Sequence, residues 1–211
     1  MRVQGSVRLR GPARRAWRPP VFWNTALPPA SMKFAAFFRN LNLGHGHAPS
    51  RMALESAFLQ AGADEAASFQ TNGTVAFSAR GVRPAQGIVR TVQRSLRAGH
   101  GFDEPVFLRS MAYLHTLLAR DPFEGMAKAP PIYDFYVTFL HDGAKLLPPL
   151  PTRNAREDVR VLLYTGSEAL SYNHLVGKTM GNPNVFAEQQ LGLPATTRTW
   201  GTVARLVRKH G

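Results

Sequence analysis

The stretch "AASFQTNGTVAFSA", residues 66–79, decides the fold, because it reads as a β-hairpin. Two runs rich in apolar residues, 66–71 and 74–79, flank Asn72-Gly73. An Asn-Gly pair between two such runs is a strong short-range signal for a hairpin, since both residues tolerate the positive φ of a tight turn. We therefore expect two antiparallel strands joined at Asn72-Gly73.

The segments on either side of this hairpin repeat one pattern. Before it lie an apolar strand, 33–38 ("KFAAFF"), and a helix that runs from the capping residue Ser50 to Gly62. After it, Pro84 opens a helix that Gly99 closes, and a strand follows at 104–109 ("EPVFLR"). The order strand, helix, strand, strand, helix, strand predicts a ferredoxin-like α+β unit with an antiparallel sheet.

The second half is expected to form another α+β unit. We predict two small subdomains, 32–125 and 126–211, which pack together because each alone is small for an independent core. The first includes the helix that follows the ferredoxin-like unit. The elements expected after residue 110 are helices at 111–120, 183–191 and 200–209 and strands at 131–141, 159–165 and 169–175.

Charge is distributed unevenly along the 211 residues. The net charge is +13, of which residues 1–31 contribute +6 through six arginines and no acid. This segment also holds five prolines, so we expect a disordered basic extension and take Met32 as a candidate for the natural start. A basic protein attracts phosphates and other anions.

The composition excludes several classes of function. There is no cysteine, which rules out disulfides and thiolate metal sites and fits a reducing compartment. No apolar run approaches the roughly 20 residues that cross a bilayer. We expect a cytoplasmic protein without membrane contact.

The loop after the first strand, "RNLNLGHGH" at 39–47, is the first candidate site. A strand that leads through a glycine-rich loop to a capped helix can hold an anion at the helix N-terminus. The dinucleotide fingerprint G-x-G-x-x-G fails, because Pro49 occupies the position of its third glycine. His45 and His47 lack a legible third ligand, so we expect no metal and no cofactor.

A basic stripe is predicted on the helix that follows the hairpin. At 100° per residue, four arginines project within about 60° of one another, opposite the apolar face. The stripe fits a nucleic-acid backbone or an acidic partner, and it equally fits the solvated face of an amphipathic helix. Its members are Arg83, Arg90, Arg94 and Arg97.

No motif commits the protein to catalysis. The G-x-S-x-G elbow and a complete phosphate-binding P-loop are both absent, since Tyr172 replaces the first glycine that "GKT" at 177–179 would need. Two pairs of adjacent acids, Asp103-Glu104 and Glu157-Asp158, are expected to be solvated at strand entrances.

Three segments resemble a known family. They are "MKFAAFFRNLNLG" (32–44), "FQTNGTVAF" (69–77) and "LGLPATTRTWGTVARL" (191–206), and the last is the most specific. Together they are similar to bacterial proteins called domain of unknown function 1697, whose members carry R-G-I-N-V-G-G, S-G-N-V-V-F and T-R-N-W-x-T in this order. The resemblance spans about 180 residues from Met32. It implies two α+β subdomains, the first ferredoxin-like, and no particular activity.

The chain departs from the family pattern and so resembles a divergent branch. The family residue is replaced at Asn40, His45, Thr74 and Thr199. The positions to which the resemblance draws attention are Arg39, Asn42, Gly44, Gly73, Arg198, Trp200 and Thr202. Each also has a structural interpretation, such as positive φ at the glycines or core packing of the tryptophan.

Three functions stay open. The first is a binding module for a small or anionic ligand, in a cleft between the subdomains lined by Arg39, Asn42, His45 and Arg198. The second is nucleic-acid binding through the arginine stripe. The third is an enzyme of unknown reaction that uses Arg39, a histidine and a bound phosphoester.

Overall fold

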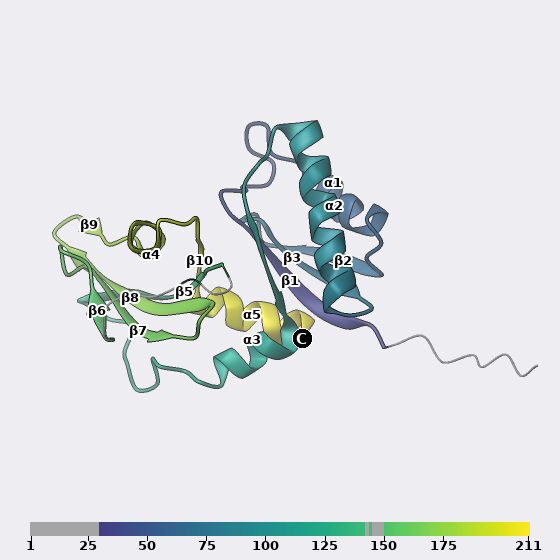
Figure 1. The fold of residues 1–211 in the computed structure, drawn as a ribbon. Helices are drawn as coiled ribbons and strands as arrows, with labels where there is room; N and C mark the ends of the chain where they lie inside the picture. Colours follow the sequence, from purple (N-terminus) through teal and green to yellow (C-terminus); the bar gives the residue numbers. More distant parts are fainter. Residues whose placement is uncertain (1–29, 142–143, 145–149) are drawn as a thin grey trace, which may run out of the picture.

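The computed structural model describes residues 30–141, 144 and 150–211, and these form two lobes, each built on an antiparallel sheet (Figure 1). The first lobe is a four-stranded sheet in the order β2-β3-β1-β4 with two helices on one face. Its elements are β1 (Met32–Phe38), α1 (Arg51–Gln60), β2 (Glu65–Phe69), β3 (Thr74–Ala79), α2 (Val82–His100) and β4 (Val106–Ser110).

The continuous apolar run of β1 is explained by its burial on both faces. Phe34, Ala36 and Phe38 belong to the core beneath α1 and α2, whereas Ala35 and Phe37 belong to the core on the opposite face. Alternation with a period of two therefore divides one strand between two cores. The β-α-β-β-α-β order and the antiparallel pairing confirm the expected ferredoxin-like α+β fold.

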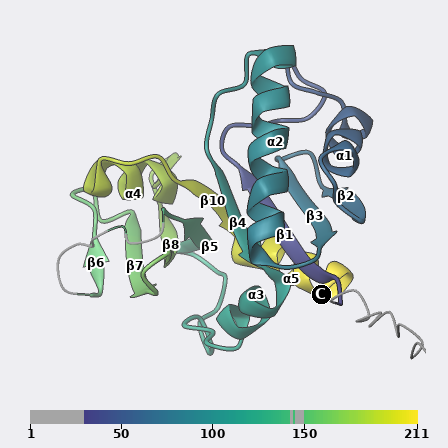
Figure 2. The same ribbon diagram turned by 45° about the vertical axis from the view of Figure 1, so that its right-hand side comes forward.

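The second lobe is a mixed-length antiparallel sheet of the order β10-β5-β8-β7-β6, with β9 paired to β8. Helix α4 (Pro183–Leu191) lies over one side of it (Figure 2). The strands are β5 (Ile132–Phe139), β6 (Thr152–Arg153), β7 (Val159–Tyr164), β8 (Glu168–Val176), β9 (Thr179–Met180) and β10 (Thr196–Thr199).

Two helices join the lobes through a shared core. In Figures 1 and 2, α3 (Met111–Leu118) and α5 (Trp200–His210) lie together where the lobes meet. Residues of both sheets pack in one cluster with these helices, and the rings of Phe37 and Phe139 stack across the lobes at 4.0 Å. The lobes are therefore packed together. The core on the face of the first sheet away from α1 and α2 is shared with the second lobe.

The hairpin turn is longer than Asn72-Gly73 alone. Phe69 pairs with Thr74, so four residues form the loop. The expectation that the strands are joined by Asn72-Gly73 alone was therefore wrong. The loop is shaped by contacts with the segment after β1: the amides of Phe38 and Leu43 donate to Gly73 O and Thr71 O, both at 2.8 Å. These bonds replace the two-residue turn that the local sequence favours.

One helix boundary and one strand also differ from the expectations. Helix α2 continues through Gly99 and ends before Gly101, which adopts φ +65 and donates its amide to Arg97 O. Strand β10 was not expected at all.

The predicted disorder of residues 1–31 concerns mainly residues 1–29, which lie outside the described part of the chain. No helix among the described residues is long and apolar enough to cross a membrane.

Candidate functional site

A polar cavity of about 680 Å³ lies where the two lobes meet, and we call it the seam cavity. Its walls come from the end of β1, the β2–β3 turn, the start of α4, β10 and the start of α5. Amide and hydroxyl side chains line it, with two arginines and no carboxylate among the described lining residues. Those used below are Arg39, Asn182, Asn184, Thr197, Arg198, Thr199 and Thr202.

Arg198 is the central polar side chain of the seam. It projects from β10 and is only 8% exposed. Its Nε donates to Thr74 Oγ1 at 3.0 Å, and Nη1 donates to Thr196 Oγ1 and Thr197 O, both at 2.9 Å. Nη2 donates to Phe38 O at 2.9 Å and Asn72 O at 2.6 Å. The five N–H groups of the guanidinium thus all bond neutral oxygens of both lobes.

This arrangement leaves the positive charge of Arg198 without an ionised partner. None of its five acceptors is a carboxylate. Burial alone lowers the pKa of the guanidinium to about 10, because the low-dielectric surroundings disfavour the charged form. An arginine still carries its proton near neutral pH at that value, so the cavity has a fixed cation in its wall.

Two helix N-termini face the same cavity. Asn182 caps α4, with its Oδ1 accepting from the amides of Asn184 and Val185 at 3.0 and 3.2 Å. Thr199 caps α5, with its Oγ1 accepting from the amide of Thr202 at 3.2 Å. Helix N-termini carry partial positive charge, so both dipoles reinforce the field of Arg198.

Arg39 also borders the seam cavity, but its charge is neutralised. Its Nε lies 2.7 Å from Glu188 Oε1 and its Nη1 lies 2.5 Å from Glu104 Oε2. The hydrogen bonds that Arg39 donates to Glu188 and then to Glu104 raise the pKa of Arg39 above its ordinary value. Glu104 was expected to be solvated, and it is instead a half-buried partner that anchors the end of β1. Arg39 therefore shapes the wall, and together with its two carboxylate partners it forms a group with a net charge of −1.

The other loop residues lie elsewhere. The chain turns at Asn40, which has φ +52, and carries Asn42 and His45 into a separate cavity of about 250 Å³. This loop folds toward the end of α2, where His100 Nδ1 lies 2.9 Å from His47 O. The expectation that Asn42 and His45 share a cleft with Arg198 is contradicted, because that turn directs them away from the lobe junction.

Three further candidates have clear positions. Gly44 is exposed in the same loop with φ +77, and nothing lies within 4 Å of a Cβ built there. Trp200 packs against Phe123 at 5.2 Å between ring centroids and lines no wall of the seam cavity. Thr202 is buried, lines the cavity, and accepts a bond at 2.9 Å from the hydroxyl of Thr199. Of the predicted ligand-binding residues, Arg39, Arg198 and Thr202 share one cavity.

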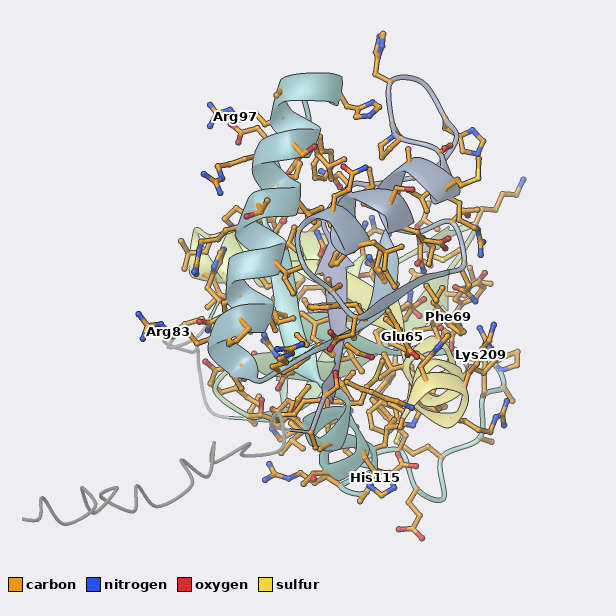
Figure 3. The ribbon with its side chains drawn as sticks, turned by 90° about the vertical axis from the view of Figure 1, so that its right-hand side faces the viewer. Glu65, Phe69, Arg83, Arg97, His115 and Lys209 are labelled. Atoms are coloured by element: carbon orange, nitrogen blue, oxygen red, sulfur yellow. The ribbon has the colours of Figure 1, made fainter. Side chains whose placement is uncertain are left out.

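The arginine stripe lies on the exposed side of α2, and Arg83 and Arg97 project from opposite ends of it (Figure 3). Arg97 pairs with Asp103 at 3.2 Å in an exposed ion pair. Arg90 and Arg94 border a shallow hollow of about 590 Å³ with Arg97. Nucleic-acid binding through these residues stays a prediction.

A second buried polar cluster was missed in the sequence. Glu168 of β8 is fully buried and contacts Arg109 of β4 and the hydroxyl of Tyr113 of α3. Arg109 also donates to Leu140 O and Ser167 O, both at 3.0 Å. Burial, followed by the hydrogen bond with Glu168, raises the pKa of Tyr113. This second set of bonds between the lobes depends on residues whose pairing no short motif reveals.

Asp158 is another correction. It is 1% exposed, in contrast to the solvated position expected for it. Its Oδ1 accepts from Asn154 at 2.5 Å, and its Oδ2 lies 3.1 Å from an exposed Arg156 nitrogen. Within the described residues, no group of three or more His, Cys, Asp or Glu side chains is arranged to hold a metal ion.

Comparison with known proteins places the chain in a family. The sequence model described as "Protein of unknown function (DUF1697)" matches residues 32–163, more than half of the chain. The chain belongs to the DUF1697 family. The family match begins at Met32, where the resemblance was seen, and the closing segment 191–206 lies beyond the matched residues.

A solved structure shares the DUF1697 chain's fold. The conserved bacterial protein SP0830 from Streptococcus pneumoniae is similar with a TM-score of 0.59 and 15% sequence identity. The similarity covers 86% of this chain and 100% of that one. At this identity the likeness concerns the fold alone. No curated protein sequence matches the chain significantly.

Proposed function

We propose that the protein binds a small anionic molecule in the seam cavity. The observation that carries this proposal is the guanidinium of Arg198, buried beside the cavity and bonded to neutral oxygens alone. A buried cation without a counter-ion favours a mobile anion nearby, because the interaction is weakly screened away from bulk water. The absence of cysteine fits our proposal that this binding takes place in the cytoplasm.

The residues that line the seam cavity fit an anion whose uncharged part is polar. The N-termini of α4 and α5 add positive potential on two further sides. Asn182, Asn184 and Thr197 offer amide and hydroxyl groups for the uncharged part of the ligand. Since every N–H of Arg198 is used within the protein, its contribution is electrostatic and the direct bonds come from these neighbours.

A substitution that introduces a negative charge at Asn184 tests the proposal. Asn184→Asp keeps the outline of the side chain and places a carboxylate in the cavity wall, in the first turn of α4, with loss of the hydrogen bond between Asn184 and Glu188. Inorganic phosphate, pyrophosphate, citrate and ribose 5-phosphate are to be titrated by calorimetry and by thermal shift. We expect at least one to bind the unaltered protein and to bind Asn184→Asp about tenfold more weakly, a change of about 1.4 kcal/mol.

Gln189→Glu is the matched control. It makes the same change of charge on an exposed position of the same helix outside the cavity lining. Equal affinity in the two variants, or no binding of any of the four anions, contradicts the proposal. Neither the nucleic-acid nor the enzyme hypothesis has an equally specific feature in its favour.

A further inference from the structure

A groove of about 550 Å³ lies between strand β4 and helix α2 of the first lobe, and we call it the β4 groove. All five residues of β4, 106–110, line it. The opposite wall is one side of α2, represented by Val82, Val89 and Arg90. Leu140 and Ser167 of the second lobe close the end near Arg109 through the bonds to its guanidinium.

Strand β4 is an edge of the first sheet, so its outer side has no neighbouring strand among the described residues. The amide of Arg39 donates to Pro105 O at 3.1 Å, which makes 39 and 105 a hydrogen-bonded pair of the β1–β4 ladder. Pairs alternate in an antiparallel ladder, so the backbone groups of Phe107 point toward β1. Those of Val106 and Leu108 consequently point outward into the groove.

Part of this outer edge is already used. The carbonyl of Leu108 accepts from Arg109 Nη1 at 2.8 Å. The amide and carbonyl of Val106 and the amide of Leu108 remain, and no described residue bonds to them. These three groups match the bonds that a short added strand makes with an edge.

The α2 wall of the groove is basic. Arg90 borders both the β4 groove and the hollow of about 590 Å³ next to it, where Arg94 and Arg97 lie. Arg83 projects from the start of the same helix (Figure 3). The acid at this surface, Asp103, lies at the far end and pairs with Arg97. Among the described residues that line the groove and the hollow, an occupant therefore meets arginines without competing carboxylates along most of its length.

The spacing of the arginines fits an extended chain. Arg90 and Arg94 are four residues apart on α2, a rise of about 6 Å. Side chains on one face of a strand recur every two residues, about 6.7 Å apart. Acidic residues at alternate positions of an added strand can thus meet Arg90 and Arg94 in turn.

We propose that the β4 groove binds an acidic peptide segment of a protein partner, which adds to the outer edge of β4 as a short strand. Its backbone bonds Val106 and Leu108, and its acids, on the side that faces α2, pair with Arg90 and Arg94. Its apolar side chains point to the opposite side, where Phe107 and Leu140 line the groove. The free strand edge favours a peptide over a nucleic acid, because a peptide backbone repeats the N–H and C=O groups with which such an edge pairs. The inference is independent of the seam cavity.

Fluorescence anisotropy with the full chain tests this binding. The probe is a labelled seven-residue peptide that alternates valine and glutamate, and its two controls are the peptide with lysine for glutamate and the peptide with every internal amide N-methylated. We expect the glutamate peptide alone to bind. The double substitution Arg90→Gln and Arg94→Gln should weaken binding about tenfold or more, since two charge-assisted bonds are lost.

The matched control is Arg120→Gln with Arg208→Gln, two exposed positions with the same loss of charge outside the groove. It should bind as the unaltered protein does, and so should Asn184→Asp, which separates this result from the seam cavity. Equal binding of the N-methylated or lysine peptide overturns the proposal, and so does the absence of peptide binding. A single-stranded oligonucleotide that binds in place of the peptide, and depends on Arg90 and Arg94, would assign the stripe to nucleic acid.

Discussion

Arg198 Nη2 donates to the carbonyl of Phe38 at 2.9 Å, which joins positions 160 residues apart in the sequence. The bond links β10 of the second lobe to the end of β1 in the first. Because the same guanidinium also bonds the β2–β3 turn through Asn72 O and Thr74 Oγ1, one side chain fixes the geometry of the lobe junction. The shape of the seam cavity follows from this residue.

Replacing Arg198 should destabilise the protein strongly. Arg198→Ala leaves three backbone carbonyls and two hydroxyls at the junction without their donor, at an expected cost of about 3 kcal/mol in the free energy of unfolding. Arg198→Lys keeps the charge but lacks the planar set of five donors, so it should recover less than half of that loss. Urea denaturation measures both, with Arg208→Ala, an exposed site, as a control expected within about 0.5 kcal/mol of the unaltered protein. Equal stability of all three variants would show that the junction does not depend on these bonds.

The buried ion pair between Arg109 and Glu168 should be equally sensitive. Glu168→Gln preserves shape but removes the carboxylate that faces a guanidinium only 10% exposed, and we expect a loss of about 3 kcal/mol. Tyr113→Phe removes one hydroxyl from the same carboxylate and should cost about 1 kcal/mol. The free energies of unfolding from chemical denaturation should keep this order, and a larger loss for Tyr113→Phe would contradict it.

The ion pair of Arg39 with Glu188 predicts a pH dependence of stability. Burial acts to raise the pKa of Glu188, but hydrogen bonds from Arg39 and the amide of Ala195 outweigh it and lower the pKa below its ordinary value of 4.5. The folded state therefore stabilises the ionised form of Glu188 more than the unfolded state does. The resulting stability is fully present above pH 4.5 and is lost as the pH falls through the lowered pKa.

Arg39→Gln should remove this contribution. The difference in unfolding free energy between the unaltered protein and the variant should be constant from about pH 6 to 8 and shrink below about pH 4.5. Arg97→Gln provides the control, because both partners of its ion pair are well exposed. A difference for Arg39→Gln that grows on acidification would refute the assignment of Glu188 as the titrating group.

Substitutions at Gly73 and Gly44 should distinguish the cost of a steric clash from the cost of backbone strain. Both have positive φ, +64 and +77, but a Cβ at Gly73 would lie 2.7 Å from Leu41 Cβ, whereas Gly44 has open space around it. Gly44→Ala should cost about 1 kcal/mol and Gly73→Ala about 2–3 kcal/mol. Thermal or urea unfolding of the two variants should reproduce this difference, and equal costs would show that the turn moves aside freely.

The first lobe could be predicted because its signals are local. The "KFAAFF" run, the Asn72-Gly73 hairpin and the helical spacing after Pro84 each fall within one element. Their order alone indicates the topology. Even there, the length of the turn depended on its contacts with Leu41 and Leu43, which no local pattern contains.

The seam cavity could be predicted only in part. Arg198 attracted attention through its motif, but its strand "TTRT" is four residues long and polar, so β10 left no hydrophobic pattern to detect. Asn182 and Asn184 enter the site because α4 begins beside β10, an arrangement set by tertiary packing. Asn42 and His45 were grouped with Arg39 because they are close to it in sequence. The chain turns at Asn40, which has positive φ, so both side chains lie in a different cavity.

The position of α5 has a consequence for biosynthesis. Residues of this helix, such as Val203 and Leu206, pack in the cluster that covers Ala35 and Phe37 of β1. While the chain is being translated, the part of this cover that α5 supplies is missing until α5 has left the ribosomal exit tunnel. Such contacts between early and late segments slow folding, so the central core can close only after α5 has been synthesised.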